Sequence, residues 1–288
     1  MIYNNIKIKK STTFDSKRKI VAHATTESWK HIPHVTYTYE PDITNFYEEF
    51  KVLAEKMESN GNKISFNTLM LKVITEGLLS AHDLNSYIEY DHEKCQGTLH
   101  ILDEINIATP WILPSGAHIT PNIPNIGKMS LSDISDYIVD LSKRIENTNI
   151  DEIANKLASK FSEEKITVLE GKEKEEYYKT PENQRLTEKD FELGTITFSN
   201  VGSLYREQKG SFCLLEVIPP QVFALGLGSV QEKPGVFIAD NGNKEIGIRK
   251  ILPMCLAFDH RAVDFSSVIP FMKKLDSIFG DPSVIHQW

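Results

Sequence analysis

The sequence lacks the features that place a protein in a membrane or outside the cell. Its 288 residues contain no run of about 18 apolar residues, and the amino terminus has no apolar core of the kind found in signal peptides. Only three cysteines are present, Cys95, Cys213 and Cys255, without a CxxC pair. An odd number of widely spaced cysteines does not indicate a disulfide framework. We therefore expect a soluble, cytoplasmic protein with no membrane contact.

The sequence has no excess of positive charge. The chain has 32 Lys and Arg against 40 Asp and Glu, which gives a formal net charge of -8. Binding to nucleic acid requires clustered cations that displace counterions from phosphate, so no nucleic-acid partner is expected. The composition is otherwise that of a globular protein, 40% hydrophobic and 25% charged. The length permits either one extended core or two modules.

Hydrophobic periodicity indicates strands and helices in the first third of the chain. Apolar and aromatic residues alternate over 35–39, which is typical of a half-buried strand. Helical spacing follows over 43–57, with Asp42 as a cap and Asn60-Gly61 as the stop. The helix that begins after Ser65 is apolar nearly all round, so it should be buried.

The rest of the chain alternates between strands and helices without an internal repeat. Strands broken by proline and glycine are expected within 98–125, and Glu and Lys dominate 151–190, which predicts an exposed helix and a mobile connector. Because strands and helices interleave irregularly, the predicted fold class is α/β (α+β), a mixed sheet with helices on its faces. Further expected elements are a helix over 134–145 capped by Ser130 or Ser132, a hairpin through Asp240-Asn241-Gly242-Asn243, and a helix over 268–279 ending at Gly280.

The motif with the most chemical content is DHRAVD at 259–264. His260 follows an apolar strand, and Asp264 stands four residues later, where a helix begins. An imidazole with an ordinary pKa near ~6.5 is mostly neutral at pH 7 and can act as a general base. Two other histidines also precede a glutamate by four residues, so the spacing alone leaves a second interpretation open. In that interpretation His260 is a strand-end histidine paired locally with Asp264.

Five segments in a fixed order give this motif its context. They are IPHVTYTYE at 32–40, ISFNTLMLKVITEGL at 64–78, GTITFSNVGSLY at 194–205, VIPPQVFALGLGSVQEKP at 217–234 and MCLAFDHRAVD at 254–264. Together they resemble the catalytic domain of dihydrolipoamide acyltransferases, the core subunits of 2-oxoacid dehydrogenase complexes, which share their fold with chloramphenicol acetyltransferase. The resemblance runs from about 14 to 282. It implies a catalytic domain over 14–288 behind an N-terminal extension at 1–13.

The resemblance also implies a mechanism. The histidine that matches His260 removes a proton from an acceptor thiol or hydroxyl, which then attacks the thioester carbonyl of an acyl-CoA. A hydroxyl of the TISN-like motif stabilises the oxyanion, and that role falls to Ser199. Asn200, in the same motif, is a weaker candidate for substrate binding. The alternative for Ser199 is a strand-end hydroxyl bonded to the backbone.

Three further residues take roles from the resemblance. Asp264 matches an aspartate that supports the site by pairing with an arginine near the start of the domain, and SKRKIVAH at 16–23 offers Arg18. Arg18 is equally well explained as a solvated surface charge. His34 matches a position near the substrate channel, although a half-buried strand histidine is the alternative.

Some segments depart from the family pattern. Phe265 stands where a glycine normally follows the aspartate, ATPWILP at 108–114 replaces a smoother apolar strand, and the charged stretch at 151–190 is longer than usual. Because these departures could reshape the substrate channel, Trp111, Tyr205 and Phe265 are candidates for contact with the acceptor. Core packing is the alternative for each of them.

The resemblance further predicts the substrates and the assembly. Nothing before residue 14 could hold a lipoyl domain, so we expect no lipoyl group in this chain, no bound cofactor and no metal. Acyl-CoA is then a co-substrate, and the acceptor is a small molecule or a separately carried group rather than a lipoyl arm in cis. A homotrimer, or a multiple of trimers, is expected from shared clefts. The final aromatic, Trp288, is either free to dock on another subunit or part of a frayed end.

Two other functions compete with acyl transfer from coenzyme A. The chain could be a non-catalytic core or assembly subunit of a dehydrogenase-like complex, although a scaffold has no need of His260 and Ser199. It could also be a condensing or amide-forming enzyme of the kind that carries an HHxxxD motif. Asp259 stands where that motif has its first histidine, which disfavours this possibility.

Overall fold

The architecture is organised around one mixed sheet. In this computed structural model the described residues are 2–3, 6–59, 61–114, 116, 118–159, 168–239 and 241–288. Six strands lie in the order β3-β14-β11-β10-β6-β9, with β11, β10 and β6 parallel to one another and the other neighbours antiparallel. This confirms the predicted mixed sheet. The strands are β3 (His34–Tyr39), β6 (Ile107–Ala108), β9 (Asn122–Ile123), β10 (Ile196–Asn200), β11 (Phe223–Leu227) and β14 (Met254–Asp259).

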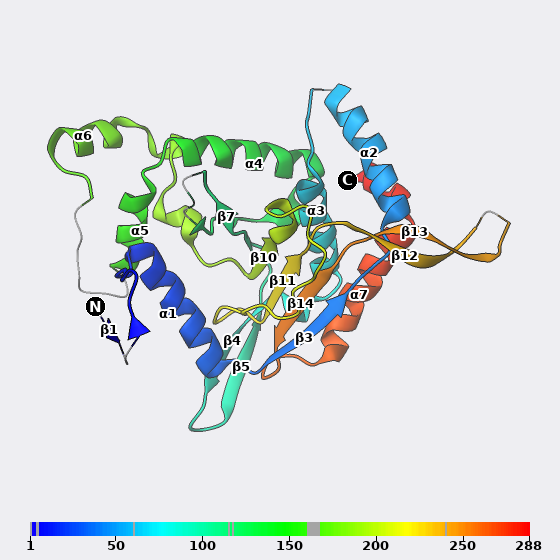
Figure 1. Cartoon of the computed structure of the whole chain (residues 1–288), viewed down its shortest axis with the longest axis horizontal. Helices are drawn as coiled ribbons and strands as arrows, with labels where there is room; N and C mark the ends of the chain where they lie inside the picture. Colours follow the sequence, from blue (N-terminus) through cyan, green and yellow to red (C-terminus); the bar gives the residue numbers. More distant parts are fainter. Residues whose placement is uncertain are drawn as a thin grey trace.

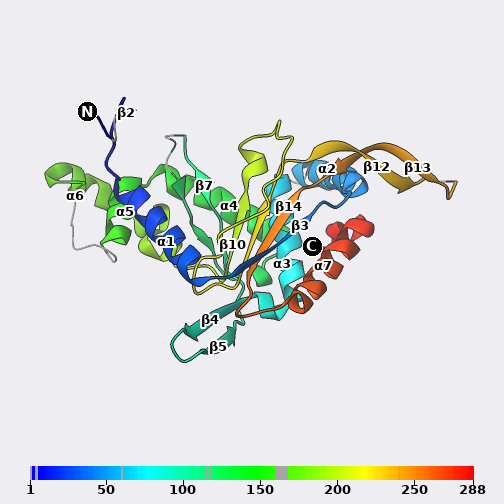
Figure 2. The ribbon, with the colours of Figure 1, turned by 60° about the horizontal axis from the view of Figure 1, so that its bottom comes forward.

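One face of the sheet carries the main hydrophobic core. Phe223 on β11 and Phe258 on β14 are both buried, and the Phe223 ring lies 5.4 Å from that of Phe271. Figure 2 shows α3 and α7 together on this side of the sheet. The predicted burial of α3 is confirmed, because Leu69 to Thr75 are all enclosed. The helices that build this core are α2 (Thr44–Ser59), α3 (Phe66–Leu79), α4 (Leu131–Glu146) and α7 (Phe265–Gly280).

The opposite face of the sheet is lined by small residues. Ala224 on β11 and Ala257 on β14 are buried there against Val217. A side chain would not fit at Gly226, because the ring of Phe212 lies 2.4 Å from the position that a Cβ would occupy. The segment 212–217 therefore packs directly on the strands, and bulkier strand residues would displace it.

The first helix was not predicted from the sequence. α1 (Ser16–His31) begins after Asp15, whose side chain accepts from the backbone N–H of Arg18. Only Ser28 is buried along it, so it has no apolar stripe that a periodicity search would detect. It is tied to α5 (Ile150–Ala158) by a 2.6 Å ion pair between Lys17 and Asp151. Polar contacts therefore hold α1 against α5.

The other helix boundaries agree closely with the predictions. Asp42 accepts a 2.9 Å hydrogen bond from the Thr44 N–H, and Ser65 accepts one of 3.0 Å from Thr68. Ser130 rather than Ser132 caps α4, in a capping box with Asp133. α7 ends at Gly280, as expected. Asn60, the predicted stop of α2, lies outside the described residues.

The charged stretch at 151–190 contains regular structure in its described part. α6 (Gly171–Lys179) has no buried residue and matches the predicted exposed helix. Arg185 nevertheless lies buried, with its guanidinium 5.4 Å from the Tyr177 ring and 5.0 Å from the Tyr178 ring. This contact anchors α6, whereas residues 160–167 of the predicted connector lie outside the described part. The short helices η3 (Glu182–Gln184) and η4 (Glu188–Phe191) follow.

Several two-stranded hairpins extend from the central sheet. The predicted hairpin is confirmed as β12 and β13, with Gly242 at φ 81°, although Asp240 lies outside the described residues. Figure 1 shows it reaching well away from the sheet. The β4–β5 hairpin was not predicted and projects from another edge. The strands of the hairpins are β1 (Ile2–Tyr3), β2 (Ile6–Lys7), β4 (Ser86–Asp91), β5 (Gln96–Ile101), β7 (Trp111–Ile112), β8 (His118–Ile119), β12 (Gln231–Ile238) and β13 (Lys244–Ile251).

The carboxyl terminus is docked on the body of the protein. Ile285 in η6 (Pro282–Gln287) is fully buried, and the Nε2 atom of His286 lies 2.6 Å from an oxygen of Glu49 on α2. Trp288 packs against the main core. The expectation of a free or frayed aromatic end is therefore wrong. Among the helices that the structure describes, none is long and apolar enough to cross a membrane.

Candidate active site

His260 is the first residue after β14, and of its two ring nitrogens only Nδ1 has partners among the described residues. Its Nδ1 atom lies 3.3 Å from the carbonyl oxygen of Val263 and 3.3 Å from an oxygen of Asp264. A carbonyl oxygen can only accept, so in the neutral imidazole that hydrogen bond requires the proton on Nδ1. No described residue bonds Nε2, and the side chain is 49% exposed. Nε2 therefore carries no proton in the neutral ring, and its lone pair is available to accept one.

The turn that carries His260 is built around Asp259. This residue is completely buried, and its carbonyl accepts from the N–H groups of Ala262 and Val263 at 3.0 and 3.1 Å. Its carboxylate is paired with Arg261 at 2.6 Å. Sequence reasoning treated Asp259 only as the residue that replaces a histidine, and it missed Arg261. The signal available was an Asp at the end of a buried strand with an Arg two residues later.

The predicted pair between Asp264 and Arg18 is not formed within this chain. Asp264 lies next to His260 and precedes α7 without a side-chain capping bond. Arg18 is exposed on the first turn of α1 and is held through its backbone N–H. The structure therefore brings Asp264, and not Arg18, to the imidazole. The reason is that Arg18 lies on the first turn of α1, which is bound to α5, whereas the other end of α1 leads to the turn after β14, where the Pro33 carbonyl accepts from the N–H of His260.

Ser199 lies on β10, half-buried, and its hydroxyl is not hydrogen-bonded to any described residue. The strand register aligns Ser199 with Gly226 on β11 and Gly226 with Cys255 on β14. His260 comes five residues after Cys255, so it lies about 17 Å further along the strand direction and two strand spacings, about 10 Å, to the side. Ser199 and His260 therefore lie toward opposite ends of the strands and cannot reach one small group within a single chain.

Asn200 and His34 both have local structural partners. Asn200 donates to Asn67 at 2.8 Å and accepts from the N–H of Ser203, which closes η5 (Val201–Ser203). The Nε2 atom of His34 accepts a 3.0 Å hydrogen bond from the Val217 N–H, and burial lowers the pKa of His34 below its usual range. These two side chains hold loops against the sheet.

The three candidate acceptor contacts lie in different parts of the molecule. Trp111 on β7 packs with Leu141 and Leu186 in a separate apolar cluster next to α4. Tyr205 is exposed just beyond η5, on the side of Ser199. Phe265 is the first residue of α7, close to His260 in sequence, and its ring lies 5.1 Å from that of Tyr37. The Phe265 side chain is 41% exposed, so it is not part of the core.

Comparison with known proteins assigns this arrangement to a family. The model of the 2-oxoacid dehydrogenases acyltransferase (catalytic domain) family matches residues 7–159 and 160–286. The chain belongs to this family. The expected resemblance and the expected enzyme class, acyltransferase, are thereby confirmed.

Relatives of the acyltransferase family agree with the assignment. The acetyltransferase component of the pyruvate dehydrogenase complex of Haemophilus influenzae is 27% identical over 258 residues, which is 88% of this chain and 36% of that relative. Superposition on the solved cubic core of the pyruvate dehydrogenase multienzyme complex gives a TM-score of 0.67 at 22% identity. The match covers 97% of this chain and 94% of the core chain. The dihydrolipoamide acetyltransferase of Azotobacter vinelandii scores 0.66 at 23% identity, with the same coverage. The chain thus has the fold of these cores and spans well under half the length of the Haemophilus relative.

Proposed function

We propose that this chain transfers an acyl group between coenzyme A and a thiol, hydroxyl or amine acceptor, with His260 as the general base. The observation that carries the proposal is the orientation of the imidazole. Nδ1 faces the Val263 carbonyl and Asp264, so the outward Nε2 is free to take the acceptor proton. The deprotonated acceptor then attacks the thioester carbonyl, and His260 returns the proton to the departing thiolate of coenzyme A. The acyl-CoA is a co-substrate, and the reaction needs no bound cofactor.

Ser199 is the proposed donor to the oxyanion formed at that carbonyl. Its half-buried hydroxyl has no competing bond from described residues, so it is available for a substrate oxygen. In the Azotobacter vinelandii relative, the roles of a serine, a histidine and an asparagine in the catalytic mechanism have been investigated, with the last two four positions apart. Asp264 stands four positions after His260 here, and we assign it the task of holding Nδ1.

The proposed site is completed by a second copy of the chain. His260 and Ser199 lie too far apart within one chain to act on the same carbonyl, as the strand register indicates. The β12–β13 hairpin offers a surface for association, because one of its faces carries Val236, Ile238, Ile246 and Ile248 at 65 to 79% exposure. A closed ring that places His260 of one copy against Ser199 of the next satisfies both observations, and we propose a trimer or a multiple of trimers.

The acceptor is the less defined substrate. The relatives are named for a dihydrolipoyllysine residue, which is a thiol acceptor. We propose a free or separately carried acceptor for this chain, with Phe265 beside the base and Tyr205 on the Ser199 side as the side chains in position to contact it. Trp111 is set aside from this role by its packing against α4.

The decisive experiment is a thiol-release assay with a panel of acyl-CoAs and acceptors, including a lipoylated domain and free dihydrolipoamide. His260→Ala should lower turnover by roughly a hundredfold to ten-thousandfold, since that is the usual contribution of general base catalysis. His100→Ala is the matched control, because His100 is an exposed histidine that lies 3.7 Å from Glu89 on the β4–β5 hairpin. A folded His260→Ala protein with wild-type turnover would overturn the assignment of the base. Wild-type protein that releases no thiol with any pair would favour an assembly role.

A further inference from the structure

The residue that follows the proposed base makes an unusually complete contact with the residue that precedes it. Arg261 donates from Nε to the Asp259 carboxylate at 3.0 Å and from Nη2 at 2.6 Å, and its backbone N–H adds a third bond of 2.9 Å. The carboxylate is fully buried, and the Arg261 side chain is 14% exposed. A planar guanidinium bonded at two points fixes the orientation of a carboxylate as well as its charge.

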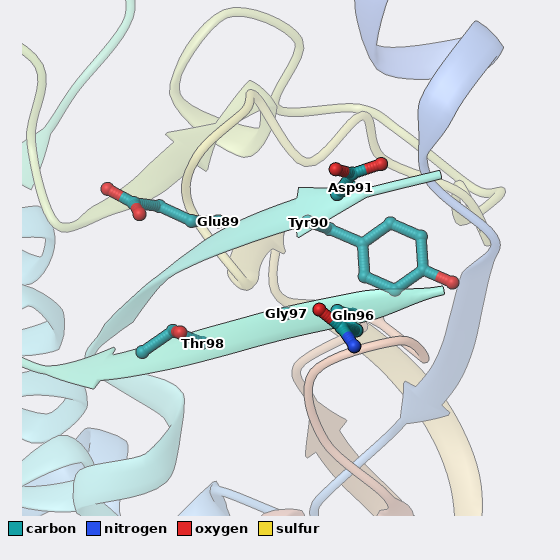
Figure 3. Close-up of a pocket in the computed structure, with 6 residues that line it drawn as sticks. All are labelled: Glu89, Tyr90, Asp91, Gln96, Gly97 and Thr98. Atoms are coloured by element: carbon teal, nitrogen blue, oxygen red, sulfur yellow. The ribbon is translucent and has the colours of Figure 1, made fainter. Parts of the chain in front are cut away.

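The outer side of Arg261 is covered by the β4–β5 hairpin. Its guanidinium carbon lies 5.3 Å from the centre of the Tyr90 ring, and its Nη1 lies 3.3 Å from Nε2 of His92. Tyr90 is paired in register with Gly97 on β5. A Cβ at position 97 would lie 3.0 Å from the Tyr90 ring, so the ring packs directly on the glycine. Figure 3 shows the ring projecting beside Gln96 and Gly97 in the pocket that these residues help to line. The hairpin thus provides a flat aromatic surface on which the guanidinium rests.

We propose that Arg261 is a positioning residue for His260 and that the β4–β5 hairpin holds it in place. The inference rests on the proposed function of His260. Arg261 fixes the Asp259 side chain, and the Asp259 carbonyl accepts from the N–H of Val263. The Val263 carbonyl in turn receives the Nδ1–H of His260. A rigid turn therefore keeps the proton on Nδ1, and the reactive lone pair stays on Nε2.

Arg261→Lys is the variant that separates positioning from charge. A lysine retains a positive charge for the buried Asp259, so the carboxylate keeps a partner and the fold is preserved. It has a single nitrogen and cannot hold both oxygens in one plane, so the turn loses its fixed geometry. We expect kcat to fall by roughly tenfold to a hundredfold, as for other small misplacements of a catalytic group, with KM for acyl-CoA unchanged. Arg144→Lys is the matched control, because Arg144 bonds Asp140 at 2.7 Å and lies over Tyr137 at 5.9 Å, on α4.

The tautomer of His260 gives a readout that does not depend on turnover. Nitrogen-15 NMR of the imidazole should show Nδ1–H in the wild type and in Arg144→Lys, and a mixture of tautomers in Arg261→Lys. A second variant tests the hairpin: Tyr90→Leu should produce the same mixture, whereas Tyr90→Phe, which keeps the ring, should not. Wild-type tautomer and kcat in both Arg261→Lys and Tyr90→Leu would overturn the inference. That outcome is distinct from failure of the proposed function, which is judged by thiol release from the wild type and from His260→Ala.

Discussion

A mixing experiment tests whether His260 and Ser199 act across a subunit boundary. The two substitutions are His260→Ala, which removes the base, and Ser199→Ala, which removes the oxyanion donor. Each variant alone should be nearly inactive, because loss of the base costs roughly a hundredfold or more and loss of one oxyanion donor costs about 3 kcal/mol in the barrier. Neither residue is buried in the core, so both variants should fold and assemble.

The expected recovery follows from the strand register. Ser199 aligns with Cys255 through Gly226, and His260 lies about 17 Å beyond Cys255, so in the proposed assembly each complete site takes its two residues from two copies. In a ring assembled at random from equal amounts of the two variants, a site is intact when one chain supplies His260 and its neighbour supplies Ser199. That combination occurs at about one site in four for any closed ring. The mixture should therefore regain about a quarter of wild-type turnover.

The assay measures thiol release after the two variants are unfolded together and refolded, with native mass spectrometry to verify mixed assemblies. Two controls bracket the result: each variant refolded alone, and the two refolded separately and then combined without exchange. Both controls should remain at the low level of the single variants. Verified mixed assemblies that stay at this level would refute the shared site, since two residues of the same chain cannot be restored by mixing.

Three further predictions concern stability and assembly. Burial lowers the pKa of His34, so at pH values below about 6.5 the unfolded chain binds a proton that the folded chain does not, and the free energy of unfolding should decrease as the pH falls. His34→Gln keeps an acceptor for the Val217 N–H and should flatten that decrease in urea titrations between about pH 7.5 and 5.5. Substitution of Val236 and Ile246 by lysine should leave each chain folded, because both side chains are exposed within it, while light scattering shows loss of the assembly and turnover disappears; a wild-type assembly size would contradict the docking face. Ser65→Ala should lower the free energy of unfolding by about 1 kcal/mol through loss of the α3 cap, and an unchanged urea midpoint would contradict that role.

Elements with a strong apolar period were predictable from the sequence. The helix after Ser65 and the helix ending at Gly280 both bury a continuous face, so the pattern that forms them is also the pattern that a reader can detect. α1 was missed because its contacts with α5 are polar, and polar contacts leave no periodic trace. The β4–β5 hairpin was missed because the residues of β5 are nearly all exposed and the turn lacks the usual Asn-Gly signal.

The candidate site was only partly predictable. His260 and Ser199 were identified through the resemblance of the ordered motifs, since neither residue is distinctive by spacing. The local pairing of Asp264 with His260 was one of the two interpretations that the sequence left open, whereas the pairing with Arg18 was wrong because Arg18 lies at the far end of α1. The pairing of Asp259 with Arg261 is local, yet its importance appears only once the carboxylate is seen to be buried under the hairpin.

The exposed apolar face of the β12–β13 hairpin should make the refolding yield depend on protein concentration, because in the proposed assembly another copy of the chain covers this face. A newly made chain presents β-branched side chains on a two-stranded ribbon whose edges have unpaired backbone groups, and such a surface also pairs with the wrong partners. Lys244 and Glu245 at the start of β13 place charges near the tip of the ribbon, which opposes stacking of one tip on another. At very low concentration the ribbon stays uncovered for longer. Refolding yield should therefore pass through a maximum, limited by slow encounter at high dilution and by aggregation at high concentration.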